Sequence, residues 1–355
     1  MKKAWPTRRG TCRPCPSPRC ANCCSGIGPL HLSLLLEDPY FPLNTELANT
    51  PLWRVDPQTR LVDADPQQSS EDFYKANFGE FAMGLASLRI LLIFKDATRL
   101  DQRQVDCLLG RGAFTPKLSA NAPVLGNPDV PLTGVTAGAR FIHGGQEPAI
   151  DLVRDGRADE FQMHNVGEEP FTHLAHRMDR INRKCRLDRM LQLPSHLVDQ
   201  LLIAAMNAER RGTGEPSIWI RPNTLRCLGL FKELNTAYDC KAEEFAAFID
   251  VLLVYGQDGQ QAHFDRVYNR EAMYESPLRI DNVEFAIVPR TEAEQQTVHQ
   301  ICSALEINFE TYRYLATVIA KAYGLKTHLV RSLAIFSSFW RLVRLGRMFG
   351  LTPIE

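Results

Sequence analysis

The sequence has no apolar run long enough to cross a membrane. Its most apolar stretch, Gly84–Phe94, is short and contains Arg89, whereas a spanning helix needs roughly 18–20 consecutive apolar residues. The basic N-terminal residues are not followed by the apolar segment that a secretory signal peptide requires. We therefore expect a cytoplasmic protein without membrane contact.

A net charge is also missing, because 41 Lys and Arg residues balance 41 Asp and Glu residues. This balance excludes a protein that coats nucleic acid with its whole surface, so any such contact must be local. The chain of 355 residues is 45% hydrophobic and 23% charged, which excludes intrinsic disorder or a collagen-like repeat as a description of the whole. Its length predicts two or three domains.

Sequence motifs of catalysis are absent as well. Residues 41–165 show no nucleophile elbow, no metal-ligand spacing and no cofactor fingerprint. Further along the chain, imidazole and carboxylate side chains occur close together without forming a H-E-x-x-H or E-x-x-H unit; they are His164, Glu168, Glu169, His173 and His176. We expect no enzyme, although an uncharacterised enzyme in residues 41–165 stays as an alternative.

Ten cysteines fall into two unlike groups. Five are scattered singly among apolar residues, as expected of reduced, buried thiols; they are Cys107, Cys185, Cys227, Cys240 and Cys302. The other five lie within the first 24 residues, where Cys12, Cys15, Cys20 and Cys23 form two C-x2-C pairs that could hold zinc. The loop between the pairs is short and contains prolines, so we expect a disordered leader and no cofactor, with zinc as the alternative.

The remaining patterns predict a mainly α protein with a minor β component, arranged in several domains. Residues 1–40 form the Cys/Pro/Arg-rich leader, and residues 41–165 a mixed α/β domain of unknown role. Residues 166–275 form a helical domain, and residues 276–355 a domain that ends in the motif described below.

A basic helix is predicted at the start of the helical domain. Apolar residues recur at spacings of three and four between Phe171 and Cys185, which marks one buried stripe. Cations cluster mostly away from this stripe; they are Arg177, Arg180, Arg183, Lys184, Arg186 and Arg189. They form either a face that meets phosphate or a solvated surface paired with acids. Pro194-Ser195 then opens a second helix.

Short signals define the C-terminal domain. Val283, Phe285 and Ile287 alternate like a half-buried strand, and Thr291-x-x-Glu294 is a capping box that opens a helix. Another helix begins after Asn308. We expect the apolar helix around Leu333–Leu345 to pack against the body of the protein or against a second subunit.

Residues Thr317–Leu333 resemble the helix-turn-helix of DNA-binding proteins. Ala320 supplies the small residue where two helices would touch, and Gly324 the positive φ that the turn needs. The resemblance implies that Thr327 caps a recognition helix lying in the major groove. It also implies that DNA is contacted by Lys321, Lys326, Thr327, His328 and Arg331.

The net charge of the C-terminal residues also favours contact with DNA. Residues 311–355 contain seven basic residues and one acid, Glu355, giving a net charge of +6. Arg331 suits guanine, whereas Lys326 and Thr327 suit phosphate. His328-x-x-Arg331 also matches a catalytic box of the tyrosine recombinases, but no tyrosine follows Tyr323.

The sequence thus predicts a protein that binds double-stranded DNA sequence-specifically, as a transcriptional regulator or a replication or maintenance factor of a bacterial mobile element. Pairing of two half-sites would favour a homodimer. The alternative is a non-catalytic assembly or interaction subunit of a multiprotein complex. Its distinguishing feature would be an exposed apolar surface around Phe336, Phe339 and Trp340.

Overall fold

The structure is a computed structural model of the whole chain, and it describes residues 54–55, 62–63, 78, 85–154, 161–166, 177–213, 218–270 and 276–354. The described part is mainly helical with small two-stranded antiparallel sheets, which confirms the predicted fold class. None of its helices is long and apolar enough to cross a membrane. The leader cysteines Cys12, Cys15, Cys20 and Cys23 lie outside the described residues.

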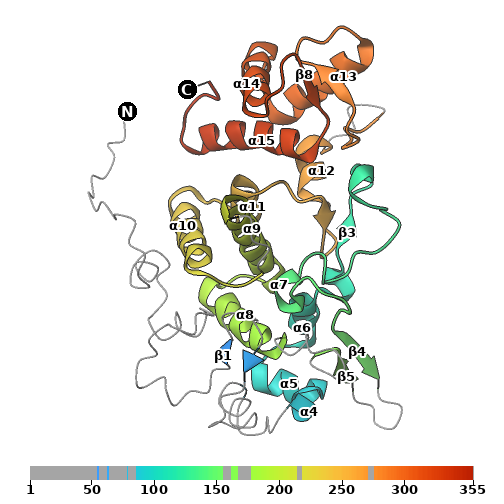
Figure 1. The fold of residues 1–355 in the computed structure, drawn as a ribbon, viewed down its shortest axis with the longest axis vertical. Helices are drawn as coiled ribbons and strands as arrows, with labels where there is room; N and C mark the ends of the chain where they lie inside the picture. The colour runs from blue at the N-terminus through green and yellow to red at the C-terminus, as the bar shows by residue number, and fades with distance from the viewer. Residues whose placement is uncertain are drawn as a thin grey trace, which may run out of the picture.

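Helices and short strands alternate in the first half of the chain and give way to longer helices in the second (Figure 1). The elements are β1 (Arg54–Val55), β2 (Val62–Asp63), α4 (Leu85–Leu88), α5 (Leu91–Thr98), α6 (Gln102–Leu109), η1 (Gly112–Phe114), β3 (Lys117–Leu118), η2 (Pro123–Leu125), α7 (Arg140–His143), β4 (Asp151–Arg154), β5 (Phe161–His164), α8 (Arg177–Leu191), α9 (Ser195–Thr213), α10 (Pro222–Tyr238), α11 (Ala242–Ile249), β6 (Tyr255–Gly256), α12 (His263–Tyr268), β7 (Glu284–Ala286), α13 (Glu292–Leu305), α14 (Phe309–Ala322), β8 (His328–Val330) and α15 (Leu333–Met348). The strands pair as β1–β2, β3–β6, β4–β5 and β7–β8.

Two hydrophobic cores organise these elements. The first gathers apolar side chains of α5 to α11, with Phe94, Ile181 and Leu202 fully buried. The second lies among α12 to α15 and β7, at the top of Figure 1, around Tyr312 and Phe339. Phe248, at the end of α11, packs against both cores and stacks on Trp340 with ring centroids 5.0 Å apart.

Local capping signals set the helices of the C-terminal part as the sequence predicts. Thr291 and Glu294 form the capping box of α13, and the Asn308 side chain accepts a hydrogen bond from Thr311 N–H at the start of α14. Such caps satisfy backbone N–H groups that have no partner inside the helix. Because they need only neighbouring residues, these two helix starts are confirmed.

The predicted recognition helix does not form. Residues His328–Val330 are instead the strand β8, whose Leu329 is paired with Phe285 of β7 and is fully buried. The next helix, α15, begins only at Leu333 and is capped by Ser332, not by Thr327. Gly324 has the expected positive φ of 69° and Ala320 is buried, but the turn they make leads into a strand. The helix-turn-helix prediction is therefore wrong.

Four of the six basic residues predicted on one face of α8 are buried, whereas Arg186 is partly exposed and Arg189 is exposed. Arg177, Arg180, Arg183 and Lys184 are only 0–5% exposed. They point neither to solvent nor to a surface where phosphate could reach them. Burying a charged group is costly unless its donors are paired, so their partners decide what this helix does.

Candidate functional site

Buried cations of α8 hold the loops around the first core. Arg177 donates hydrogen bonds of 2.6–2.7 Å to the backbone carbonyl oxygens of Gln146, Pro148 and Asn165. Arg180 donates to the carbonyls of Phe141 and Ile218, and its guanidinium lies 3.7 Å from the centroid of the Trp219 ring. These arginines therefore satisfy backbone acceptors that would otherwise be buried without a partner.

The five residues predicted to contact DNA do not share one helix face. Lys321 lies in the last turn of α14, Lys326 and Thr327 in the turn that follows, and His328 at the start of β8. All four are exposed. Arg331, the residue expected to read guanine, is held in an ion pair with Asp281, with Nε–Oδ1 and Nη2–Oδ2 distances of 2.9 and 2.6 Å.

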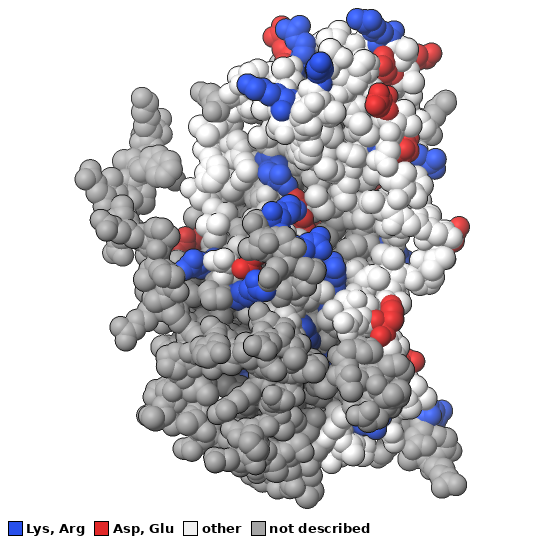
Figure 2. Space-filling view, in the orientation of Figure 1, with Lys and Arg blue, Asp and Glu red and all other residues white. Residues whose placement is uncertain are grey.

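The basic C-terminal segment is largely neutralised by acids that come earlier in the chain or by carbonyl groups. Arg344 pairs with Glu244 at 2.8 Å, and Arg347 lies 3.6 Å from Glu306 and donates to two carbonyl oxygens. Figure 2 shows acidic side chains among the basic ones over the C-terminal part at the top of the view. The local charge of +6 therefore overstates the positive surface.

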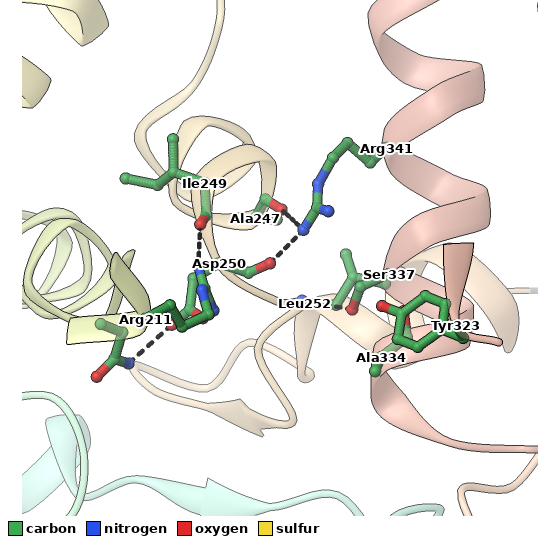
Figure 3. A network of polar contacts seen from close by, with 10 residues as sticks. Arg211, Ala247, Ile249, Asp250, Leu252, Tyr323, Ala334, Ser337 and Arg341 are labelled. Carbon is green, nitrogen blue, oxygen red and sulfur yellow. Dashed lines mark hydrogen bonds and ion pairs between the residues drawn. The ribbon is translucent and has the colours of Figure 1, made fainter. Parts of the chain in front are cut away.

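Arginines from two other helices meet the C-terminal end of α11, a site that we call the α11 junction (Figure 3). Arg341 of α15 donates to the carbonyl oxygens of Ala247 and Asp250, and Arg211 of α9 donates to that of Ile249. Arg211 also pairs with the Asp250 carboxylate at 2.6 Å. The last carbonyl groups of a helix lack partners within it and carry partial negative charge, so cations are favoured there.

Neutral groups continue the α11 junction toward α15. Ser337 Oγ accepts a 3.0 Å hydrogen bond from Leu252 N–H, and Asn207 donates to the Asp250 carboxylate at 2.8 Å. Figure 3 shows Arg341 and Ser337 on the side of α15 that faces α11. Since α9 belongs to the first core, α11 contributes to both and α15 lies mainly in the second, these contacts join the two cores.

The aromatic residues of α15 face inward. Phe336 and Phe339 are fully buried and Trp340 is nearly so, which confirms that this helix packs against the body of the protein. They do not form the exposed apolar surface expected of an interaction subunit. Any interaction surface must therefore lie elsewhere on the chain.

Cysteine and histidine side chains in the described ranges form no metal site. No group of three potential His, Cys, Asp or Glu ligands occurs within them, and of the candidate cluster around residue 170 only His164, on β5, is described. The five scattered cysteines are free; Cys107, Cys185 and Cys240 are buried as predicted, whereas Cys227 and Cys302 are only partly buried. Burial raises the pKa of Cys185 to about 12 and that of Cys240 to about 11, which keeps both thiols protonated.

The sequence identifies the basic residues of α8 and α15, but it does not reveal which groups they contact. The acceptors of Arg177 lie 12–31 residues before it, and Arg341 reaches carbonyl groups more than 90 residues away. Counting the charges within a short segment of sequence cannot detect contacts between residues so far apart. A usable signal was the position of Arg177 one turn before Ile181, on the stripe side of the helix, where a cation must be buried.

The described residues define a mainly helical scaffold in which buried cations join loops and helix ends. Over 295 residues the chain is 31% identical to the toxin subunit YenA1 of Yersinia entomophaga, a match that covers 81% of the chain and 24% of YenA1. The chain is thus homologous to a segment of a toxin subunit and spans about a quarter of the length of that curated relative.

Two solved structures are also similar. The Yersinia pseudotuberculosis TcaA–TcaB structure matches with 17% identity and a TM-score of 0.38, covering 49% of this chain and 8% of that one. Morganella morganii TcdA4 matches with 16% identity and a TM-score of 0.41, covering 68% of this chain and 10% of that one. No family model matches the chain.

The homology corrects the functional prediction. The similarity is to a segment of a toxin subunit and not to a transcriptional regulator or a replication factor, and it does not indicate double-stranded DNA as a partner. The homodimer was expected only because helix-turn-helix proteins bind paired DNA half-sites. Since the motif does not form, that reason no longer applies. The alternative, an assembly or interaction subunit of a multiprotein complex, fits the comparison better.

Proposed function

We propose that this chain is a structural and interaction segment of a toxin subunit, and that it performs no catalysis itself. The observation that carries this proposal is the 31% identity to YenA1 over 81% of the chain. That identity extends far beyond any single motif, so it relates most of the chain to the relative and not one short site.

The internal contacts support a structural role for the scaffold. The buried cations of α8 and the α11 junction use their donors on this chain's own carbonyl groups and carboxylates. Groups fixed in this way stabilise one arrangement of helices and loops. A rigid arrangement suits a segment that must hold its shape within a larger assembly.

A chimera tests the proposal directly. The segment of YenA1 that matches this chain is replaced by the chain, and the purified chimera is tested for assembly with the other subunits of that toxin. We expect assembly and retained toxicity. Two controls are a chimera carrying an unrelated helical segment and one carrying Phe339→Asp, which places a charge in the second core.

The outcomes separate folding from function. A chimera that folds, as judged by circular dichroism and a cooperative melt, but fails to assemble would contradict the proposal. Gel-shift assays on the isolated chain provide a second check. Specific retention of a DNA duplex at moderate salt would contradict the proposal.

A further inference from the structure

A pocket of about 480 Å³ opens between α6, the turn that joins α8 to α9, and the loop after β6. Its volume falls within the roughly 300–1,000 Å³ range of small-molecule sites. One face of α6 supplies Arg103, Cys107 and Leu108, and the loop supplies Asp258. The pocket lies away from the α11 junction and plays no part in the proposed function.

Apolar side chains form most of the pocket wall. Leu100, Leu108, Phe114 and Leu193 line it together with Pro194 at the start of α9. Leu108 and Phe114 are buried in the chain, so this wall is set by the core and not by surface side chains. An apolar wall of this kind favours a ligand whose body is aromatic or aliphatic.

The charged groups at the pocket already have partners within the chain. Arg103 forms two 2.7 Å hydrogen bonds with the Asp258 carboxylate, and Asp188 accepts one of 2.6 Å from Lys184. Arg189 donates to the carbonyl oxygen of Thr98. Each of these charged groups therefore already has a partner with which a charged ligand would have to compete, although the Arg103–Asp258 pair is exposed, with 65% and 30% of the two side chains accessible.

Cys107 and His196 both line the pocket and form a close side-chain contact that is not an ion pair. The Cys107 sulfur lies 3.3 Å from His196 Nδ1, and the imidazole ring packs against Phe114 with centroids 5.4 Å apart. Burial raises the pKa of Cys107 and lowers the pKa of His196. Both groups are therefore neutral near pH 7, which argues against a thiolate nucleophile here.

The contact is compatible with the His196 tautomer in which the Cys107 thiol is the donor and Nδ1 the acceptor. When the neutral thiol donates its hydrogen to Nδ1, the imidazole proton resides on Nε2. Within the described ranges no hydrogen-bond partner of Nε2 is observed. In this tautomer His196 presents Nε2–H as a donor at the pocket, beside the side-chain amide groups of Gln104 and Gln192, which also line it.

We propose that this pocket binds a compact, uncharged, largely apolar ligand that carries one hydrogen-bond acceptor, and that His196 Nε2–H donates to that acceptor. The apolar walls supply affinity and the imidazole supplies orientation. The occupancy of every charged group explains why the ligand is neutral.

Two nearly isosteric probes test the proposal on the full chain. Acetophenone is neutral and aromatic with one carbonyl acceptor, whereas α-methylstyrene has a methylene group in place of that oxygen. Binding is measured by titration with ligand-observed NMR. We expect millimolar affinity for acetophenone, as is usual for a probe of this size, and about fivefold to tenfold weaker binding of α-methylstyrene, the difference that one hydrogen bond makes.

Three variants and a matched control locate the site. His196→Phe should abolish the preference for acetophenone, and His196→Gln, which keeps a donor, should restore part of it. Leu100→Trp should fill the pocket and weaken both probes at least about tenfold. Leu92→Trp is the control, because Leu92 is 67% exposed on α5 and does not line the pocket.

Several results would overturn the proposal. They are absence of binding by both probes, equal affinity for the two probes in the wild-type chain, and unchanged binding in a folded Leu100→Trp variant. A pocket that takes neither probe but gains hydrogen-exchange protection when another toxin subunit is added would show that a protein side chain occupies it. That result would also overturn the small-molecule proposal.

Discussion

Arg331 and Asp281 form a two-point ion pair between the residue that follows β8 and the turn that precedes β7. Both side chains are about three-quarters buried, with 24% of each exposed. Arg331 N–H also donates to the carbonyl oxygen of Val283, so side chain and backbone both connect the same two segments. The arginine is therefore used to hold the β7–β8 sheet.

Arg331→Ala should reduce the stability of the protein. Loss of a two-point, partly buried ion pair should lower the free energy of unfolding by about 1–2 kcal/mol. Urea denaturation measures the loss, and a double-mutant cycle with Asp281→Ala should show that the two changes are not additive. The control Lys326→Ala alters an exposed side chain and should change stability by less than about 0.5 kcal/mol.

The opposite pattern would contradict this role. If Arg331→Ala left the unfolding midpoint unchanged but abolished binding of a DNA duplex, the arginine would be a contact residue and not a structural one. Additive losses in the cycle would likewise separate Arg331 from Asp281.

Arg341→Met should loosen the α11 junction. The substitution keeps an apolar stem but leaves the carbonyl groups of Ala247 and Asp250 without their donor, at a cost of about 1–3 kcal/mol. Hydrogen exchange should accelerate at Asp250–Leu252 and in the facing turns of α15. Arg313→Met, on the exposed face of α14, is the control and should leave exchange there unchanged. Unaltered exchange in Arg341→Met would contradict the assignment of the junction.

Local signals and long-range contacts explain which sequence predictions succeed. The starts of α13 and α14 depend on Thr291, Glu294 and Asn308, whose partners lie within three residues. The strand β8 depends on Phe285, which is far from Leu329 in the sequence. A segment that turns after Gly324 is compatible with either a helix or a strand, and only the pairing with β7 decides between them.

The candidate sites also combine residues that the sequence identifies with long-range partners that it does not. The cations of α8 could be listed from the sequence, but their acceptors come from several separate loops. Cys107 and His196 are 89 residues apart and belong to no spacing motif. Because the chemistry of each group depends on such partners, the sequence could name the charged residues without predicting what they do.

His143 should make the protein less stable as the pH falls below neutrality. Its Nδ1–H donates to the carbonyl oxygen of Ala139 at 2.8 Å, and its Nε2 accepts from Ile150 N–H at 3.0 Å, an arrangement that needs the neutral ring. Burial, with a further contribution from Arg177, lowers the pKa of His143 to about 4 from about 6.5. Between these values the unfolded chain binds more protons than the folded one, so stability falls with falling pH by up to about 1.4 kcal/mol per unit.

Urea midpoints measured at pH 7, 6 and 5 test this dependence. His143→Gln should flatten the slope, whereas His299→Gln, at an exposed position on α13, should not. Burial lowers the pKa of His263 to about 3, so part of the slope should remain in the His143→Gln variant. An identical slope in wild type and His143→Gln would contradict the assignment.

Lys184→Met should be among the most damaging single substitutions in α8. The ammonium group is fully buried and uses its three hydrogens on Asp188 Oδ1, Ser195 Oγ and the Ser195 carbonyl oxygen, at 2.6–2.7 Å. Removing it leaves a largely buried carboxylate without its cation, at a cost of about 3–5 kcal/mol. Lys184→Met combined with Asp188→Leu should be less destabilising than Lys184→Met alone, because no unpaired charge remains. Lys232→Met, on the exposed side of α10, is the control. If the double variant were less stable than Lys184→Met alone, the loss of stability would come from lost packing and not from the unpaired Asp188 carboxylate.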